Sequence, residues 1–187
     1  VARDRTSNLV SLLLHDKLVR IDLATQQVEP ALATSWEISG DGRQWTLHLR
    51  PDVSFSDGTP FSSEDVVFSF AAVYDARTAS PLSGSLQVAG KPLEVSAFDP
   101  LTVVISLPEP FGPGPRLLDN LPILPKHKLA QALDAGTLRD VWGPGTPPGE
   151  LVGLGPFVLT GYQPGERLTF ARNPRFWRHD DHGARLP

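Results

Sequence analysis

The stretch that decides the fold is WTLHLRPDVSFSDGTPFSSEDVVFSF, residues 45–70. In its first part Trp45, Leu47 and Leu49 alternate with polar residues, so we expect a strand with one buried face and one wet face. Immediately upstream, the Asp-Gly pair at 41–42 separates two strand-like runs. Glycine accepts the positive φ that a tight turn demands, so this pair predicts an antiparallel hairpin.

The second half of the stretch is dense in carboxylates and hydroxyls, which could serve either catalysis or structure. Residues 57–60 (DGTP) have turn chemistry, and Ser62 is followed three residues later by Asp65, just before an apolar helical run. Hydroxyls and carboxylates are preferred at helix starts, so we favour caps and turns over catalysis. The alternative is a hydrolase acting through Asp52 or Asp57 in a cleft, which would need closely packed, solvent-poor carboxylates.

Composition narrows the function classes. The 187 residues carry a net charge of −4 without a basic run, so we expect no nucleic-acid partner. No stretch approaches the ~20 apolar residues that span a bilayer, so we expect no direct membrane insertion of this segment. The absence of cysteine excludes thiol catalysis and disulfides. Because methionine is also absent, we expect a processed or excised piece, with any signal peptide upstream.

The remainder of the chain predicts a mixed α/β protein with mostly antiparallel pairing. The Gln-Pro-Gly-Glu sequence at 163–166 predicts a type II turn, because proline occupies its second position and glycine its third. The other expected elements are a helix over 8–19 running into a short strand, a strand over 101–107, a helix opening after Pro125, two strands within 157–172, and loops over 108–115 and 143–149.

The sequence gives little support for metal binding, phosphate binding or serine-type hydrolysis. The cluster His179-Asp180-Asp181-His182 is contiguous, and an extended backbone points neighbouring side chains in opposite directions, so we expect no metal site. The glycine-rich loops at 112–115 and 153–156 contain proline, which lacks the N–H that a phosphate cradle uses. No G-x-S-x-G elbow occurs. We therefore expect no cofactor.

Four stretches, in order, carry a resemblance to a known family. They are VEPALATSWEISGDGRQWTLHLRPDVSFSDGTPFSSEDVVFSF (28–70), AFDPLTVVISLPEPF (97–111), LPILPKHKL (121–129) and GLGPFVLTGYQPGERLTFARNPRFW (153–177). Together they resemble the family 5 extracellular solute-binding proteins, the oligopeptide, dipeptide and nickel receptors of ABC importers. In that family the first block is scaffold rather than a catalytic centre.

The resemblance implies a fold and a domain layout. The expected fold class is α/β (an α+β-like mixed sheet), the N-terminal lobe portion of a periplasmic-binding-protein type II-like fold with an inserted subdomain. Residues 1–32 and 153–187 would be two pieces of lobe I, and residues 33–152 would be the inserted subdomain, Ib. The second lobe is absent from this chain, so the resemblance implies weak or no peptide binding by the fragment alone.

The resemblance also implies a function. We expect a non-catalytic receptor for a peptide or other small solute, which it delivers to the transmembrane subunits of an ABC permease. The expected location is periplasmic or extracellular, with any lipid anchor on an upstream segment. A ligand-sensing module of a regulator is the alternative, because the same module can serve as a sensor.

Three stretches match the family's cleft-lining segments, residues 4–8, 82–85 and 154–155. For each of them an ordinary loop or helix cap is the alternative. The ligand-binding residues implied by the resemblance are Asp4, Arg5, Ser7, Asn8, Leu82, Ser85, Leu154 and Gly155.

Overall fold

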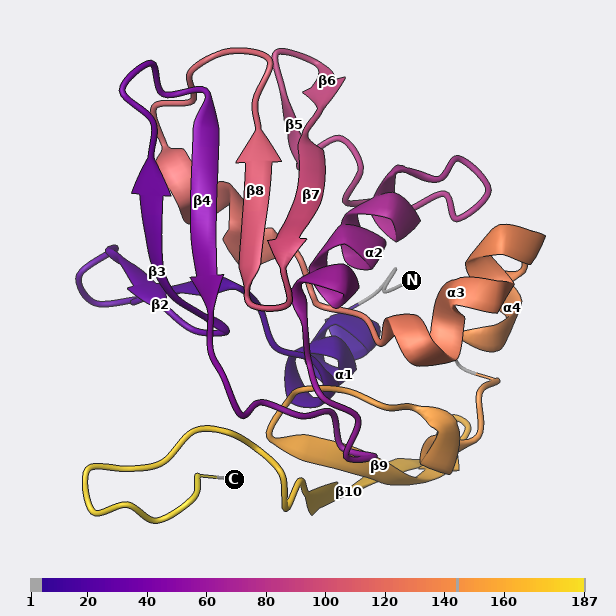
Figure 1. The fold of residues 1–187 in the computed structure, drawn as a ribbon. Coiled ribbons are helices and arrows are strands. Elements are labelled where there is room, and N and C mark those ends of the chain that lie inside the picture. Colours follow the sequence, from indigo (N-terminus) through magenta and orange to yellow (C-terminus); the bar gives the residue numbers. More distant parts are fainter. Residues whose placement is uncertain (1–4, 144, 187) are drawn as a thin grey trace.

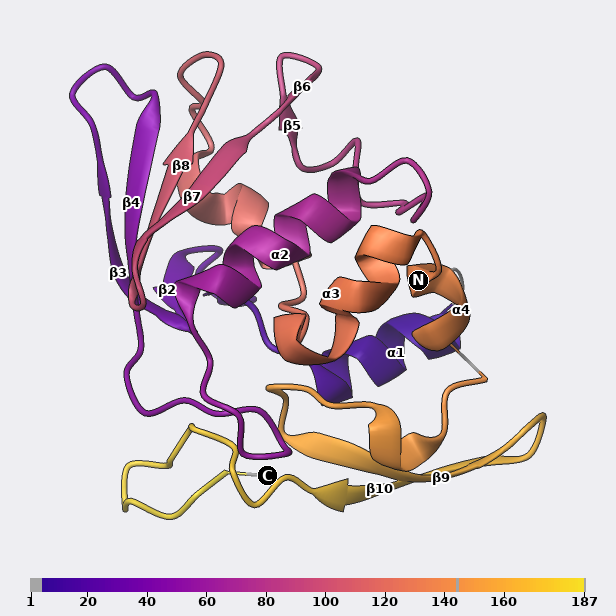
Figure 2. The same ribbon diagram turned by 45° about the vertical axis from the view of Figure 1, so that its right-hand side comes forward.

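A four-stranded antiparallel sheet is the largest sheet of the computed structural model, which describes residues 5–143 and 145–186. Its strands lie in the order β3 (Ala33–Ile38), β4 (Gln44–Leu49), β8 (Thr102–Ser106) and β7 (Glu94–Asp99). Helix α2 (Ser63–Tyr74) crosses one face of this sheet (Figure 2). The prediction of a mixed α/β chain with antiparallel pairing is confirmed.

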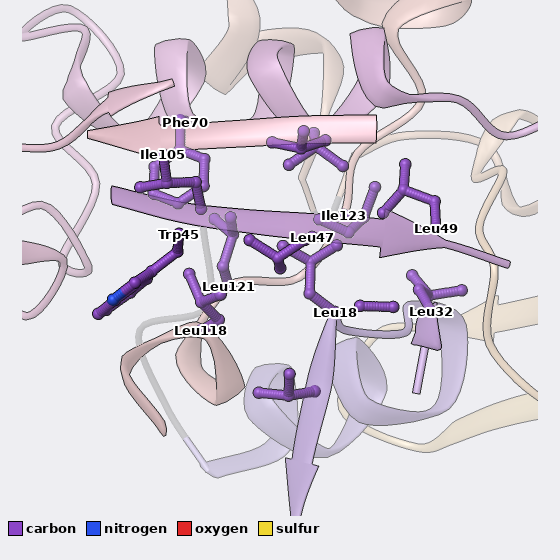
Figure 3. Packing of buried hydrophobic residues seen from close by; sticks show 14 of the residues in the cluster. Leu18, Leu32, Trp45, Leu47, Leu49, Phe70, Ile105, Leu118, Leu121 and Ile123 are labelled. Atoms are coloured by element: carbon purple, nitrogen blue, oxygen red, sulfur yellow. The ribbon is translucent and has the colours of Figure 1, made fainter. Parts of the chain in front are cut away.

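The core lies between the sheet and the elements that cover this face. Trp45, Leu47 and Leu49 of β4 are buried, as their alternation predicts, while the residues between them are only partly covered. They pack with Ile105 of β8, with Phe70 of α2 and with leucines from the segments at 18–32 and 118–121 (Figure 3). The alternating pattern therefore fixes which side of the sheet receives the helix.

The remaining elements lie below the sheet and on the side of α2, which leaves the other face of the sheet open (Figure 1). Three further pairs of strands are two-stranded antiparallel ribbons: β1 with β2, β5 with β6 and β9 with β10. The bounds are α1 (Arg5–Leu14), β1 (Val19–Ile21), β2 (Val28–Pro30), β5 (Gln87–Val88), β6 (Lys91–Pro92), the 3-10 helix η1 (Gly114–Asn120), α3 (Lys126–Ala135), α4 (Leu138–Val141), the 3-10 helix η2 (Pro148–Glu150), β9 (Phe157–Gln163) and β10 (Arg167–Arg172).

Both predicted turns are confirmed. Gly42 has a φ of 70° between β3 and β4. Gly165 has a φ of 76° between β9 and β10, and the N–H of Glu166 donates to the carbonyl of Gln163 at 3.1 Å. This geometry is that of a type II turn with glycine at its third position.

Helix α1 lies on the β9–β10 ribbon, and two glycines allow the close approach (Figures 1 and 2). A Cβ built at Gly153 would stand 1.8 Å from the carbonyl oxygen of Leu14, and one at Gly155 would stand 2.4 Å from that of Leu13. Instead, the N–H of Gly155 donates to the Leu14 carbonyl at 2.9 Å. The Gly-x-Gly sequence at 153–155 therefore allows the end of α1 to pack directly against the backbone of this loop.

A second contact ties the C-terminal segment to the same junction. The indole Nε1 of Trp177 donates to Oδ2 of Asp16 at 2.7 Å, and the Arg50 guanidinium lies 4.3 Å from the centre of the indole. Burial raises the pKa of the Asp16 carboxyl. Segments near the two ends of the chain thus pack against each other. Within the described residues no helix has the length and apolar character needed to cross a bilayer.

Candidate functional site

The carboxylates of the stretch 45–70 hold helix starts together. Oδ2 of Asp65 accepts the N–H of Ser62 at 2.9 Å, which completes the predicted capping box of α2. Oδ1 of the same carboxylate accepts the N–H of Lys126 at 3.0 Å, in the first turn of α3. Burial raises the pKa of Asp65, against the lowering effect of these hydrogen bonds. Asp65 therefore caps two helices at once.

Asp57 joins the turn at 57–60 to α3. Its Oδ2 lies 2.8 Å from Nε2 of His127, and the Phe55 ring meets the His127 ring edge-on at 5.3 Å. Partial burial raises the pKa of Asp57, but hydrogen bonds from Thr59 and His127 outweigh it and hold this pKa below its ordinary value. Asp52 is exposed on a turn with a φ of 59°. The predicted caps and turns are confirmed, and an exposed Asp52 does not meet the requirement of the hydrolase alternative for solvent-poor carboxylates.

A groove of about 770 Å³ lies beside α1, and it is the feature best suited to hold a small molecule. Its walls come from α1, the end of α2, the loop at 78–82, α4 and the β9–β10 ribbon. The lining is mainly apolar and includes Leu12, Leu82, Leu138, Trp142 and Leu159. Small-molecule sites are typically apolar hollows of ~300–1,000 Å³ with a few polar groups, and this groove fits that description.

The structure places one of the three predicted stretches, residues 82–85, at this groove. Leu82 lines it directly. Arg5, Ser7 and Asn8 belong to the first turns of α1. Later residues of the same helix form one wall of the groove, namely Val10, Ser11, Leu12 and Leu14. Asp4 lies outside the described residues.

Ser85 and the third stretch are placed differently. Ser85 is exposed, and its hydroxyl donates to the carbonyl of Leu82 at 3.0 Å. The side chain of Leu154 is 1% exposed in the core, and Gly155 lies against the end of α1. The Gly155 carbonyl accepts the side-chain amide of Asn173 at 2.8 Å. Residues 154–155 thus pack against the end of α1. Their contact with a ligand stays a prediction.

Sequence reasoning missed two aromatic residues of the groove, His15 and Trp142. Their ring centres lie 6.1 Å apart at a tilt of 44°. Burial lowers the pKa of His15 to about 4, so the imidazole is neutral at neutral pH. Its Nδ1 is buried, without a hydrogen-bond partner in the described part of the chain. Nothing in the local sequence links these residues, because they follow different helices and meet only in the fold.

Comparison with a family model gives a match over residues 27–186 to the bacterial extracellular solute-binding proteins, family 5 Middle. Among curated proteins, the periplasmic oligopeptide-binding protein OppA of Escherichia coli (strain K12) is 34% identical over 164 residues, which cover 80% of this chain and 29% of that protein. Protein XP55 of Streptomyces lividans is 37% identical over 153 residues, covering 81% of this chain and 26% of that protein.

Solved structures give the same picture. The Haemophilus influenzae OppA complex with the peptide RPPGFSPFR matches with a TM-score of 0.78 and 27% identity, over 94% of this chain and 36% of that one. DppA from Helicobacter pylori in complex with the peptide STSA matches with a TM-score of 0.76 and 28% identity, over 95% and 37%. The chain therefore spans about a third of the length of the proteins it matches, and its fold is that of the corresponding part of such binding proteins.

Proposed function

Because this chain belongs to the bacterial extracellular solute-binding proteins of family 5, we propose that it is part of a non-catalytic receptor that binds a solute for an ABC importer. A peptide is the first candidate. Two kinds of finding support this: the matched OppA is named an oligopeptide-binding protein, and two matched structures hold peptides. The groove beside α1 is the observation in this chain that carries the proposal, since it is large enough for a solute and is bordered by α1 and Leu82.

In this proposal the groove forms one wall of the solute site. Leu82 and the α1 wall contact the solute directly. The other residues proposed as contacts are Asp4, Arg5, Ser7, Asn8, Ser85, Leu154 and Gly155. For Leu154 the contact would run through the backbone, because its side chain is buried.

The proposed domain layout assigns residues 1–32 and 153–187 to lobe I and residues 33–152 to an inserted subdomain. The hydrogen bonds between Gly155 and Leu14 and between Trp177 and Asp16 support the pairing of the two outer segments. A second lobe, which these residues do not include, would close over the groove by a hinge motion and complete the grip on the solute.

The partner and the location follow from the same membership. We propose that the complete receptor delivers its solute to the transmembrane subunits of an ABC permease, from the periplasm or the outer cell surface. A lipid anchor, where one exists, would lie on an upstream segment. The periplasmic location in the names of matched relatives supports this part of the proposal.

A thermal-shift screen of the complete protein tests the function. Short peptides, a sugar set and a nickel–histidine complex are compared at equal concentrations. A bound solute raises the melting temperature by mass action, with roughly 2.7 kcal/mol of added stability at a hundredfold excess over Kd. We expect shifts with peptides. Shifts with another solute class and none with peptides would contradict the peptide assignment.

A further inference from the structure

The charges that line the groove largely cancel one another. Nζ of Lys17 lies 3.2 Å from Oδ1 of Asp119, and both residues border the groove. Among the described lining residues the other charged side chain is that of Arg139, an exposed residue of α4. The described residues of the walls therefore offer no buried, unpaired counter-charge to a charged group of a solute.

The backbone N–H and carbonyl of Leu82 both form hydrogen bonds within their own loop. The N–H of Leu82 donates to Oγ of Ser80 at 3.3 Å. Its carbonyl accepts both the hydroxyl of Ser85 at 3.0 Å and the N–H of Leu86 at 3.1 Å. Leu82 consequently presents its side chain, and not its peptide groups, to a solute in the groove.

A second polar group of the lining is also satisfied internally. The hydroxyl of Thr146 donates to the carbonyl of Val141 at 2.9 Å and accepts the N–H of Gly143 at 3.0 Å. Beside it the rings of His15 and Trp142 form an aromatic corner. Because burial lowers the pKa of His15 to about 4, this corner carries no charge at neutral pH.

From these contacts we infer that the groove selects solutes with a bulky, uncharged apolar group, in particular peptides that carry an aromatic or branched aliphatic side chain. This rests on the proposed function and adds the solute class to it. An apolar side chain gains from leaving water against Leu82 and Trp142. A lysine side chain at the same place loses its hydration and meets no unpaired carboxylate among the described lining residues. A glutamate side chain loses its hydration too, and its one cationic neighbour there outside the Lys17–Asp119 pair is Arg139, which is exposed to water.

Isothermal titration of the complete protein tests the inference. Four tripeptides differ only in the central residue: Ala-Phe-Ala, Ala-Leu-Ala, Ala-Lys-Ala and Ala-Glu-Ala. We expect the first two to bind at least about tenfold more tightly than the last two, a ratio that one well-buried apolar group can supply.

Two variants locate the effect in the groove. Leu82→Glu places a charge on the wall, whereas Leu23→Glu makes the same change at a residue that is 87% exposed on the β1–β2 turn. We expect Leu82→Glu to weaken Ala-Phe-Ala binding by at least about tenfold and Leu23→Glu to leave it unchanged. Leu82→Ser serves as a milder variant, and melting curves check that each protein is folded.

The possible outcomes test the apolar selectivity and the proposed peptide-receptor function separately. Equal binding of all four peptides, or an equal loss in both glutamate variants, overturns the apolar selectivity and leaves a peptide receptor in place. Absence of binding by every peptide, with a melting shift from another solute class, overturns the peptide function itself. A preference for the phenylalanine and leucine peptides that Leu82→Glu removes supports both.

Discussion

Asp65 shows how much a single carboxylate organises in this fold. It accepts one N–H from the start of α2 and one from the start of α3, while Nζ of Lys126 also reaches Glu64 at 2.7 Å. Each of the two hydrogen bonds to Asp65 satisfies a backbone N–H that a helix start leaves without a partner. The first of these contacts is local and was predicted from the Ser62–Asp65 spacing. The second joins residues far apart in the chain, and no local pattern announces it.

Replacing Asp65 with asparagine tests this double cap. An amide has one acceptor oxygen in place of two, so one of the helix-start N–H groups loses its partner. We expect a loss of about 1–2 kcal/mol in the free energy of unfolding, measured in urea. Asp134→Asn, at an exposed residue of α3, is the matched control and should change stability by less than about 0.5 kcal/mol. Equal midpoints for the two variants would contradict the double cap.

His15 makes stability depend on pH. Its pKa is about 4 in the folded protein and 6.5 in the reference state, so the folded protein binds fewer protons between these values. Stability is therefore fully present above the unfolded value and falls as the pH drops towards the folded one, by roughly 3 kcal/mol at most for this shift. Urea unfolding at about pH 7.5 and about pH 4.5 should show a smaller drop for His15→Phe than for the wild type.

The control for this prediction is His48→Phe, at a partly exposed residue on the open face of the sheet. This variant should keep the pH dependence of the wild type. If His15→Phe kept it as well, the neutral, buried imidazole would not be the source.

At the scale of elements, local chemistry predicts turns and strands well and predicts their packing poorly. The turns at Gly42 and Gly165 are confirmed because each needs only its own residues to demand a positive φ. Sequence reasoning rejected the loop at 153–156 as a phosphate cradle and assigned Leu154 and Gly155 to ligand binding, but it did not predict that this loop packs against the end of α1. This packing depends on the carbonyl oxygen of Leu14, which is distant from the loop in the sequence.

Gly153→Ala tests the seat of α1 on the β9–β10 ribbon. The added Cβ would overlap the Leu14 backbone, so the helix must shift, and we expect a loss of about 1–3 kcal/mol or more in urea unfolding. Gly149→Ala adds the same methyl group where no atom lies within 4 Å, and it should be close to neutral. A Gly153→Ala protein as stable as Gly149→Ala would show that the close approach does not matter.

At the scale of the molecule, the groove is assembled from regions that lie far apart in the chain, from α1 to the β9–β10 ribbon. The resemblance to a family pointed to Leu82, which borders the groove, and to residues 4–8, whose contact with a solute stays a prediction. It did not point to His15, Trp142 or Leu159, because their convergence depends on how α4 and the β9–β10 ribbon pack against α1. Family motifs can therefore indicate single residues of a site, such as Leu82. The full set of residues that line the groove can be identified only from the packed structure.

The central claim is that the complete protein holds a peptide in this groove without transforming it. Titration with Ala-Phe-Ala, followed by mass spectrometry of the peptide released on denaturation, tests that claim most directly. We predict saturable binding with one peptide per protein, recovery of the peptide intact, and binding weakened at least about tenfold by Leu82→Glu. Recovery of cleaved peptide, or binding that Leu82→Glu leaves unchanged, would contradict it.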